Sequence, residues 1–393
     1  MDRRHINIFG CGKTAVQFYN RYKKQVQIGY AISNNKKELF FSPEEGVEYK
    51  VKRPEAKMGQ EDLIIICSND YDNIAEQLML LGYQPFKDFI DYQLADILWS
   101  EKKIALLYGI CHLRGISECL RQSKEFTERY EVFYYANYLI SSVYGNMRFQ
   151  YIITKCDLLI YNFAASPESS RMNEAVLSRL PKKGKTLCLP IIYFGGYFPQ
   201  SQRMFNEMNP YAIKCDGYNY TPFSYGDSWL NQCIDQGMSV ADILDSLYHT
   251  DIYDEQFLES YLENEWKRFR FQEQQGEFRF ADYIQENFQK RRLFRNEGHM
   301  ENEILIYYAR QVLEKLDVDD TLNIIDEPLM KCSQHLIYPS TAKILGLEWD
   351  VMNEILDLYT YNGWKKISVC EFVEKYVEYS SAIRRLKSEK LLP

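Results

Sequence analysis

A cysteine at the end of a hydrophobic segment is the first residue with a candidate chemical role. The run from Ile104 to Tyr108 is apolar, stops at Gly109-Ile110-Cys111-His112, and leads into a segment of helical character from Leu113 to Leu120. A strand that turns into a helix places the turn at the carboxyl edge of a sheet, near the positive end of the helix dipole. There we expect a thiol to lose its proton more easily than a free cysteine, whose pKa is about 8.5. Cys111 is therefore a candidate nucleophile; the alternative is an ordinary buried cysteine.

A histidine far along the chain is a candidate general base. His299 follows the polar segment 291–298 and precedes an amphipathic helix that we predict from Glu301 to Leu316. Imidazole titrates near neutral pH, so His299 could accept a proton, although it could equally be a surface or capping residue. A nucleophile on the first strand–helix turn and a histidine before the last helix is the arrangement of SGNH-type hydrolases. This interpretation requires Cys111 and His299 to meet in one cleft.

Asn162, Tyr193 and Tyr197 could contribute to the cleft that we expect around Cys111 and His299. Asn162 follows the predicted strand 158–161 and could donate to an oxyanion, or could simply end the strand. Tyr193 and Tyr197 flank Gly195-Gly196 and could cover a bound ligand such as a sugar, or could pack in the core.

Two short basic clusters could meet the phosphate groups of a ligand. They are Lys182-Lys183-Gly184-Lys185 and the pair Arg291 and Arg292. The alternative is that they are solvated loops. We expect no metal site, because no cluster has calcium or zinc spacing.

A glycine turn near the N-terminus indicates a second candidate site. Gly10-Cys11-Gly12-Lys13-Thr14-Ala15 lies between a predicted strand and a predicted helix, as in phosphate-binding turns, and Gly10 and Gly12 are candidate binding residues. The next predicted strand, 26–32, is followed by Ser33-Asn34-Asn35 without the carboxylate that would hold a ribose hydroxyl, so NAD is not expected. The glycines could serve only the turn, or could bind a nucleotide or nucleotide-sugar in a simpler mode. The segment resembles the small Rossmann-like modules attached to bacterial sugar-modifying acyltransferases and glycan-assembly enzymes.

The order of predicted elements indicates an α/β fold. Strands at 6–9, 26–32 and 62–67 alternate with helices, and a second alternating set has strands at 104–108, 130–135, 158–161 and 186–189, followed by helices from about residue 240. We predict a Rossmann-like parallel-sheet module at 1–98, a second α/β domain with a helical C-terminal part at 99–350, and a helical tail at 351–393.

The composition limits the possible partners. The 393 residues carry a net charge of −8 without a long basic stretch, which argues against nucleic acid as a main partner. The 32 tyrosines suit wet grooves that bind sugars or nucleotides, although base composition of the genome could also produce them. No apolar stretch approaches the roughly 20 residues of a membrane span, and no signal-peptide core is present, so we expect a cytoplasmic protein. The ten cysteines lack a CxxC pair and are expected to be reduced.

From about Ile104 to Leu347 the chain resembles the WcbI family of capsular polysaccharide biosynthesis proteins. The matching segments are Gly109–His112, Leu189–Pro199, Gln236–Leu244, Leu293–Met300, and Tyr338–Thr341 with Leu345–Leu347. The resemblance implies a bacterial protein with an SGNH-like fold that binds coenzyme A, and it implies ligand contacts around Gly109 and Asn296. Ile110 and His112 replace the amide-bearing neighbours of the family's cysteine, and Glu297 and Gly298 separate Asn296 from His299.

These observations lead to one preferred hypothesis and two alternatives. The preferred hypothesis is a coenzyme A-dependent acyltransferase that acts on a sugar hydroxyl, with Cys111 as acyl carrier or lining residue and His299 as general base. His112 could be a local base, an oxyanion donor or a helix cap. The alternatives are a glycan esterase or deacetylase, and a non-catalytic scaffold. Each of these hypotheses is compatible with a glycan or nucleotide-sugar as the ligand and with a homo-oligomer.

Overall fold

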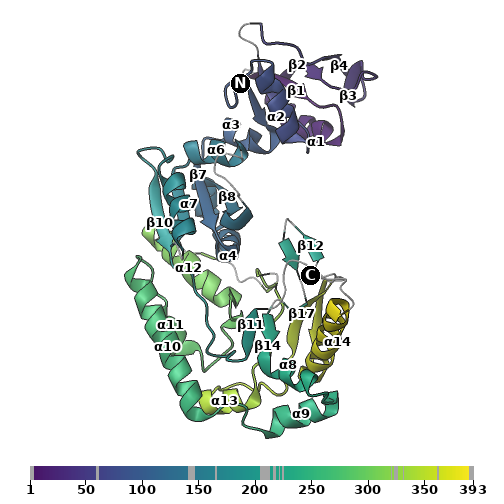
Figure 1. Ribbon diagram of the computed structural model, residues 1–393. Coiled ribbons are helices and arrows are strands. Elements are labelled where there is room, and N and C mark those ends of the chain that lie inside the picture. The colour runs from purple at the N-terminus through teal and green to yellow at the C-terminus, as the bar shows by residue number, and fades with distance from the viewer. Residues whose placement is uncertain are drawn as a thin grey trace. The chain divides into compact units, whose positions relative to one another are not determined.

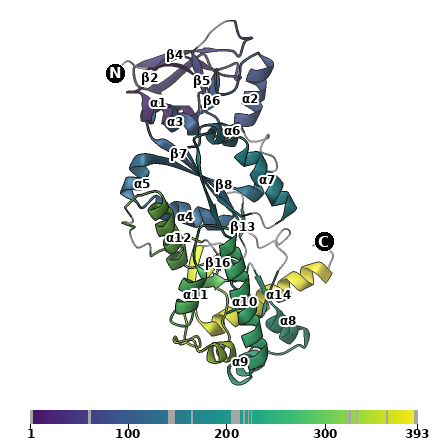
Figure 2. The ribbon, with the colours of Figure 1, turned by 90° about the vertical axis from the view of Figure 1, so that its left-hand side faces the viewer.

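A computed structural model gives the arrangement of most of the chain (Figures 1 and 2). It describes residues 4–58, 62–139, 147–163, 166–203, 213–215, 218–220, 222–223, 225–319, 321–322, 326–330, 332–360 and 363–388. The chain forms two compact units. Unit 1 comprises Met1–Ala105, Ile140–Asp157 and Arg171–Gly184, and unit 2 comprises Leu106–Leu139, Leu158–Ser170 and Lys185–Pro393.

Unit 1 is built on a six-stranded sheet with the order β3-β4-β2-β1-β5-β6. Its elements are β1 (Arg4–Phe9), α1 (Lys13–Tyr22), β2 (Val26–Ile32), β3 (Phe40–Glu44), β4 (Val47–Lys52), β5 (Leu63–Ile66), α2 (Tyr71–Leu80), β6 (Phe89–Asp91), α3 (Ala95–Trp99) and α6 (Met147–Thr154). All pairs are parallel except β3 with β4, which form an antiparallel hairpin at one edge. The α/β class is confirmed. β5 and the last four residues of β1 are almost wholly buried, whereas β2 alternates between buried and more exposed residues.

The glycine turn joins β1 to α1. Gly10 has φ +118°, and a Cβ there would lie 2.7 Å from the carbonyl oxygen of Cys67, so this position requires glycine. A Cβ on Gly12 would meet nothing within 4 Å. No carboxylate follows β2 directly, yet the chain folds back so that Glu38 accepts a hydrogen bond from the Ser33 hydroxyl. A carboxylate therefore does lie at the end of β2, supplied by a loop rather than by the strand.

The second sheet has four strands in the order β10-β9-β7-β8. Its strands and the helices between them are β7 (Lys103–Gly109), α4 (Cys111–Leu120), α5 (Lys124–Arg129), β8 (Tyr130–Ala136), β9 (Leu158–Asn162), α7 (Pro167–Leu177) and β10 (Lys185–Leu189). β9 and β10 pair in parallel. Each strand lies within two residues of its predicted bounds.

The remainder of unit 2 is mostly helical. Its helices are α8 (Ser228–Asp235), α9 (Val240–His249), α10 (Glu255–Gln274), α11 (Ala281–Asn287), α12 (Asn302–Lys315) and α13 (Pro339–Leu345). Short antiparallel pairs join β11 (Ser201–Arg203) to β14 (Tyr225–Asp227), β12 (Ile213–Cys215) to β13 (Tyr218–Tyr220), and β15 (Phe294–Asn296) to β16 (His299–Met300). α12 buries the predicted face of Ile304, Leu305, Tyr308 and Val312. It packs on α4 so closely that a Cβ on Gly115 would lie 2.7 Å from Leu305.

The tail after residue 350 contains more than the helix that we expected. The hairpin of β17 (Leu356–Thr360) and β18 (Gly363–Ile367) precedes α14 (Val369–Ser388). Phe223, Leu358, Phe372 and Tyr376 share one hydrophobic core that joins this hairpin, α14 and α8. Within the described residues, no helix is both long enough and apolar enough to cross a membrane.

Candidate active site

The turn between β7 and α4 is held by the neighbouring strand. The side-chain oxygen of Asn162, at the end of β9, accepts a hydrogen bond from the backbone N–H of Ile110 at 2.9 Å. Asn162 Nδ2 donates to the carbonyl of Leu189 at 3.4 Å. A Cβ on Gly109 would lie 2.2 Å from Asn162 Oδ1, so only glycine permits this approach. Asn162 thus positions the turn that starts with Cys111.

The hairpin of β15 and β16 carries the histidine. Asn296 and His299 are paired across the two strands, and Glu297 and Gly298 form the turn between them. These two residues, which depart from the family pattern, are therefore what brings Asn296 beside His299.

Cys111 and His299 meet although 188 positions separate them. Cys111 Sγ lies 3.5 Å from His299 Nε2. Asn296 Oδ1 lies 2.9 Å from His299 Nδ1 and also accepts from the Gly298 N–H at 3.1 Å. Because an amide oxygen only accepts hydrogen bonds, the ring proton is on Nδ1, and the lone pair on Nε2 faces the thiol. Cys111, His299 and Asn296 thus have the geometry of a nucleophile, a base and an orienting group.

Both reacting groups are neutral at neutral pH. Burial raises the pKa of Cys111 to about 12, although backbone N–H groups at the start of α4 and the Arg114 guanidinium lower it. Burial, helped by His112 and Arg295, lowers the pKa of His299 to about 3. The expectation of an easily ionised thiol is wrong, because the burial of the thiol outweighs the backbone N–H groups and the guanidinium that favour the thiolate. Each side chain nevertheless keeps some exposed surface.

His112 holds the turn of the β15–β16 hairpin through a hydrogen bond. It is 2% exposed, and its Nε2 donates to the Gly298 carbonyl at 2.7 Å. Burial lowers its pKa to about 4, so the ring is neutral. We expected His112 to be a local base, an oxyanion donor or a helix cap, and this contact is none of these. The ring instead fixes the turn that carries His299.

Tyr193 and Tyr225 flank the turn between β15 and β16, whereas Tyr197 lies in the core. The Tyr193 ring is 5.9 Å from the His112 ring, and the Tyr225 ring is 6.4 Å from the His299 ring. A Cβ on Gly298 would lie 2.1 Å from the Tyr225 hydroxyl. Tyr197 is fully buried and donates to the Phe288 carbonyl, so it is a core residue and does not line an open lip.

Three side chains of the basic clusters, those of Lys185, Arg291 and Arg292, have partners within the protein. Arg291 pairs with Glu303, and Arg292 pairs with Glu354 at 2.6 Å with only 7% of its side chain exposed. Lys185 donates to the Lys315 carbonyl at 2.6 Å. The two arginines that we assigned to phosphate binding therefore have their charges matched by carboxylates.

Several residues of the site were not identified from sequence. Arg295 is 1% exposed and pairs with Glu301 at 3.0 Å and Asp357 at 3.2 Å, which anchors the β15–β16 hairpin. Asn296 was assigned to ligand binding, whereas its side chain holds His299; the signal available was the Asn-x-x-His spacing of a tight hairpin. Tyr225 had no sequence signal. Among the described residues, no three His, Cys, Asp or Glu side chains are grouped as metal ligands.

Comparisons with known proteins place the chain in a family. The sequence model of a family described as polysaccharide biosynthesis enzyme WcbI matches residues 104–321, more than half of the chain. No curated protein matches. A solved structure of WcbI, described as a novel polysaccharide biosynthesis enzyme in a native form without a disulfide bond between coenzyme A and a cysteine, has a TM-score of 0.55 and 16% sequence identity. That alignment covers 71% of this chain and 90% of the WcbI chain, which shows a shared fold. The chain belongs to the WcbI family of polysaccharide biosynthesis enzymes.

Proposed function

We propose that this protein is an acyltransferase that moves an acyl group from acyl-coenzyme A to a sugar hydroxyl during capsule or exopolysaccharide synthesis. The observation that carries the proposal is the 3.5 Å approach of Cys111 Sγ to His299 Nε2, with Asn296 fixing the imidazole. The family description supports a polysaccharide substrate, and the WcbI structure described with coenzyme A supports the choice of donor.

In the first half-reaction Cys111 takes the acyl group. Its sulfur attacks the thioester carbonyl while the thiol proton moves to His299 Nε2. The carbon–sulfur bond to coenzyme A then breaks, and the departing sulfur takes that proton. The products are free coenzyme A and an acyl thioester on Cys111.

In the second half-reaction the acyl group passes to the glycan. His299 Nε2 removes the proton from a sugar hydroxyl as its oxygen attacks the acyl carbon, and the proton then returns to the Cys111 sulfur as the thioester breaks. The backbone N–H groups of Cys111 and His112 begin α4 and face the sulfur, where they can stabilise the oxyanion of each step. Neutral starting groups suit this scheme, because every proton transfer is coupled to bond formation.

The residues around the thiol are compatible with coenzyme A as a donor. Cys111 keeps part of its surface exposed, so a thioester can reach it, and Tyr193 at half-burial can lie along a pantetheine arm. Arg114, on α4, places a positive charge near the thiol. We propose that the 99–350 domain, SGNH-like in its arrangement, performs the chemistry in the cytoplasm, and that the 1–98 module positions a nucleotide-linked or lipid-linked glycan.

The test mixes purified protein with radiolabelled acetyl-coenzyme A and with glycans extracted from the organism that naturally makes the protein. We expect label in glycan, and loss of that transfer in Cys111→Ala and His299→Ala with unchanged circular dichroism. Native mass spectrometry of the purified protein is expected to show bound coenzyme A. Release of free acetate at equal rates with and without glycan would favour an esterase instead. Full transfer by Cys111→Ala would refute the acyl-carrier role.

A further inference from the structure

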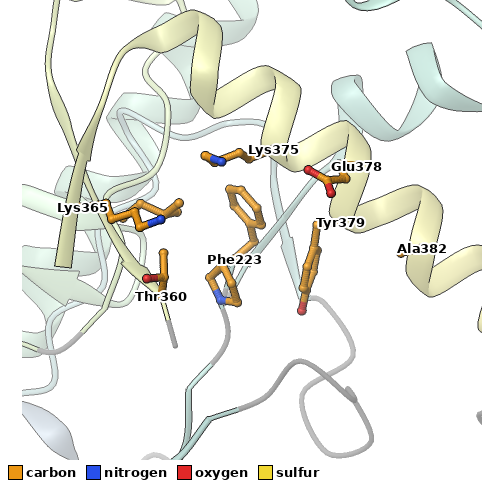
Figure 3. Close-up of a pocket in the computed structure, with 9 residues that line it drawn as sticks. Phe223, Thr360, Lys365, Lys375, Glu378, Tyr379 and Ala382 are labelled. Atoms are coloured by element: carbon orange, nitrogen blue, oxygen red, sulfur yellow. The ribbon is translucent and has the colours of Figure 1, made fainter. Parts of the chain in front are cut away.

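A cavity in the C-terminal part of unit 2 has the character of a ligand site. It has a volume of about 230 Å³ and lies between the β17–β18 hairpin and α14. Figure 3 shows Thr360 and Lys365 of the hairpin facing Glu378 and Tyr379 of α14, with Phe223 between them. Most of the lining lies beyond residue 321, where the family match ends.

The floor of the cavity is apolar and aromatic. Phe223 and Tyr379 have ring centroids 5.4 Å apart and belong to the core shared with Leu358. Because both rings are fixed by this core, they present rigid surfaces at little cost in side-chain entropy. The volume is below the roughly 300–1,000 Å³ of sites for drug-sized ligands, so it accommodates one ring system.

The mouth of the cavity is positively charged. Lys365 and Lys375 contribute two ammonium groups, against one carboxylate from Glu378. Among the described residues, neither lysine has a carboxylate oxygen within 4 Å, although Lys375 lies one turn after Glu371 and feels its charge. Two such ammonium groups beside an aromatic cavity are suited to an anion, and lysine is a common partner of phosphate.

The cavity shares part of its lining with a smaller cavity that also borders residues of the candidate active site. A smaller cavity of about 10 Å³, the space of roughly one water molecule, shares Pro222 and Phe223 with it and reaches Tyr225 and Asn296. Phe223 thus lines both the cavity and the space beside Asn296, the residue that holds His299. This placement suits the non-reacting end of a long substrate, whose binding energy can hold the reacting end in place.

We propose that this cavity binds a nucleoside phosphate, with the base against Phe223 and Tyr379 and the phosphate at Lys365 and Lys375. Bases stack on aromatic rings without needing sequence-specific contacts. The nucleotide could be the adenosine end of coenzyme A or the carrier of a nucleotide-linked sugar. The choice between these two nucleotides rests on the proposed function. The binding of a nucleotide in the cavity does not require acyl transfer.

The test is calorimetric titration of the full-length protein with adenosine 3′,5′-bisphosphate, UDP-N-acetylglucosamine, inorganic phosphate and glucuronate. We expect one of the two nucleotides to bind, and its dissociation constant to rise at least about tenfold in Lys365→Gln/Lys375→Gln. The control Lys290→Gln/Lys343→Gln removes the same charge from two exposed lysines outside the cavity and should bind as the parent does. Binding of the adenosine compound identifies the donor, and binding of the uridine compound identifies the acceptor.

Three results would overturn the proposal: equal binding by both double variants, no binding of either nucleotide to the parent, or tighter binding of glucuronate than of both nucleotides. Repeating the titration with Cys111→Ala separates this inference from the proposed function. Retained nucleotide binding in a variant without acyl transfer supports the cavity even if the chemistry assigned to Cys111 fails.

Discussion

Asn296 and His299 are cross-strand partners in a hairpin with a two-residue turn, and their 2.9 Å contact decides which imidazole nitrogen faces Cys111. The nitrogen that faces the sulfur carries the lone pair and can act as a base. The other nitrogen holds the proton and is tied to a neutral amide rather than to a carboxylate. A neutral partner does not stabilise an imidazolium ion as an aspartate would, which agrees with the low pKa of His299.

The orienting role of Asn296 can be separated from a purely structural one. Replacement of His299 with alanine should lower the acyl-transfer rate about 10²- to 10⁴-fold, because it removes the general base. Asn296→Ala should give a smaller decrease in kcat with little change in KM, because the base remains but can adopt the wrong tautomer. The control is Asn353→Ala, at an exposed asparagine. An Asn296→Ala enzyme with parental kcat would contradict the triad.

The reactivity of Cys111 should report its buried environment. Since burial raises its pKa to about 12, alkylation by iodoacetamide should be slow at pH 7 and should increase about tenfold per pH unit up to pH 10. The measurement is peptide mass spectrometry over time, with exposed Cys370 in the same sample as a reference for reagent access. A rate that levels off below pH 8 would instead indicate a thiolate paired with a charged histidine.

Gly298 should be indispensable for a steric reason that a second substitution can relieve. A Cβ at this position lies 2.1 Å from the Tyr225 hydroxyl and 3.1 Å from the ring carbon that bears it. Gly298→Ala should therefore displace the turn and lower transfer activity. Addition of Tyr225→Phe removes the closest atom and should restore part of the loss. If the double variant is no better than Gly298→Ala, the clash with Tyr225 is not the cause.

Buried neutral histidines should make the protein sensitive to acid. His335 is 4% exposed, neither ring nitrogen has a hydrogen-bond partner among the described residues, and burial lowers its pKa to about 3. Below pH 6.5 the unfolded chain binds a proton at this site that the folded chain does not, so stability falls as pH falls toward 3.

The contribution of His335 can be measured by denaturant unfolding at pH 7 and pH 5. Its ring packs near Phe198 and Phe372, so His335→Leu keeps an apolar side chain there. The loss of unfolding free energy between the two pH values should be about 2 kcal/mol smaller in His335→Leu than in the parent. An equal loss in both proteins would show that His335 is protonated in the folded state.

The sequence was sufficient for the elements that hydrophobic pattern determines. Continuous apolar runs predicted β5 and β7, and the 3.6-residue period predicted the buried face of α12. The β3–β4 hairpin was missed because its strands are short and because exposed residues alternate with less exposed ones along each strand. Glu38 was missed because a loop, not a strand, carries it to the end of β2.

At the site, the residue types were predictable but several of their environments were not. Cys111 and His299 are together as the sequence analysis required, but helix-dipole reasoning gave the wrong direction for the thiol pKa because it considers only neighbours along the chain. Tyr193 and Tyr197 flank the same glycine pair, and only the packing distinguishes the residue beside His112 from the one in the core.

Rapid-quench peptide mapping after mixing the enzyme with acetyl-coenzyme A decides whether Cys111 carries the acyl group. We expect a transient acetyl thioester on Cys111, removed by hydroxylamine, formed more slowly in His299→Ala and consumed when the glycan acceptor is added. Transfer to glycan with no acetyl group on Cys111 at any time would contradict it.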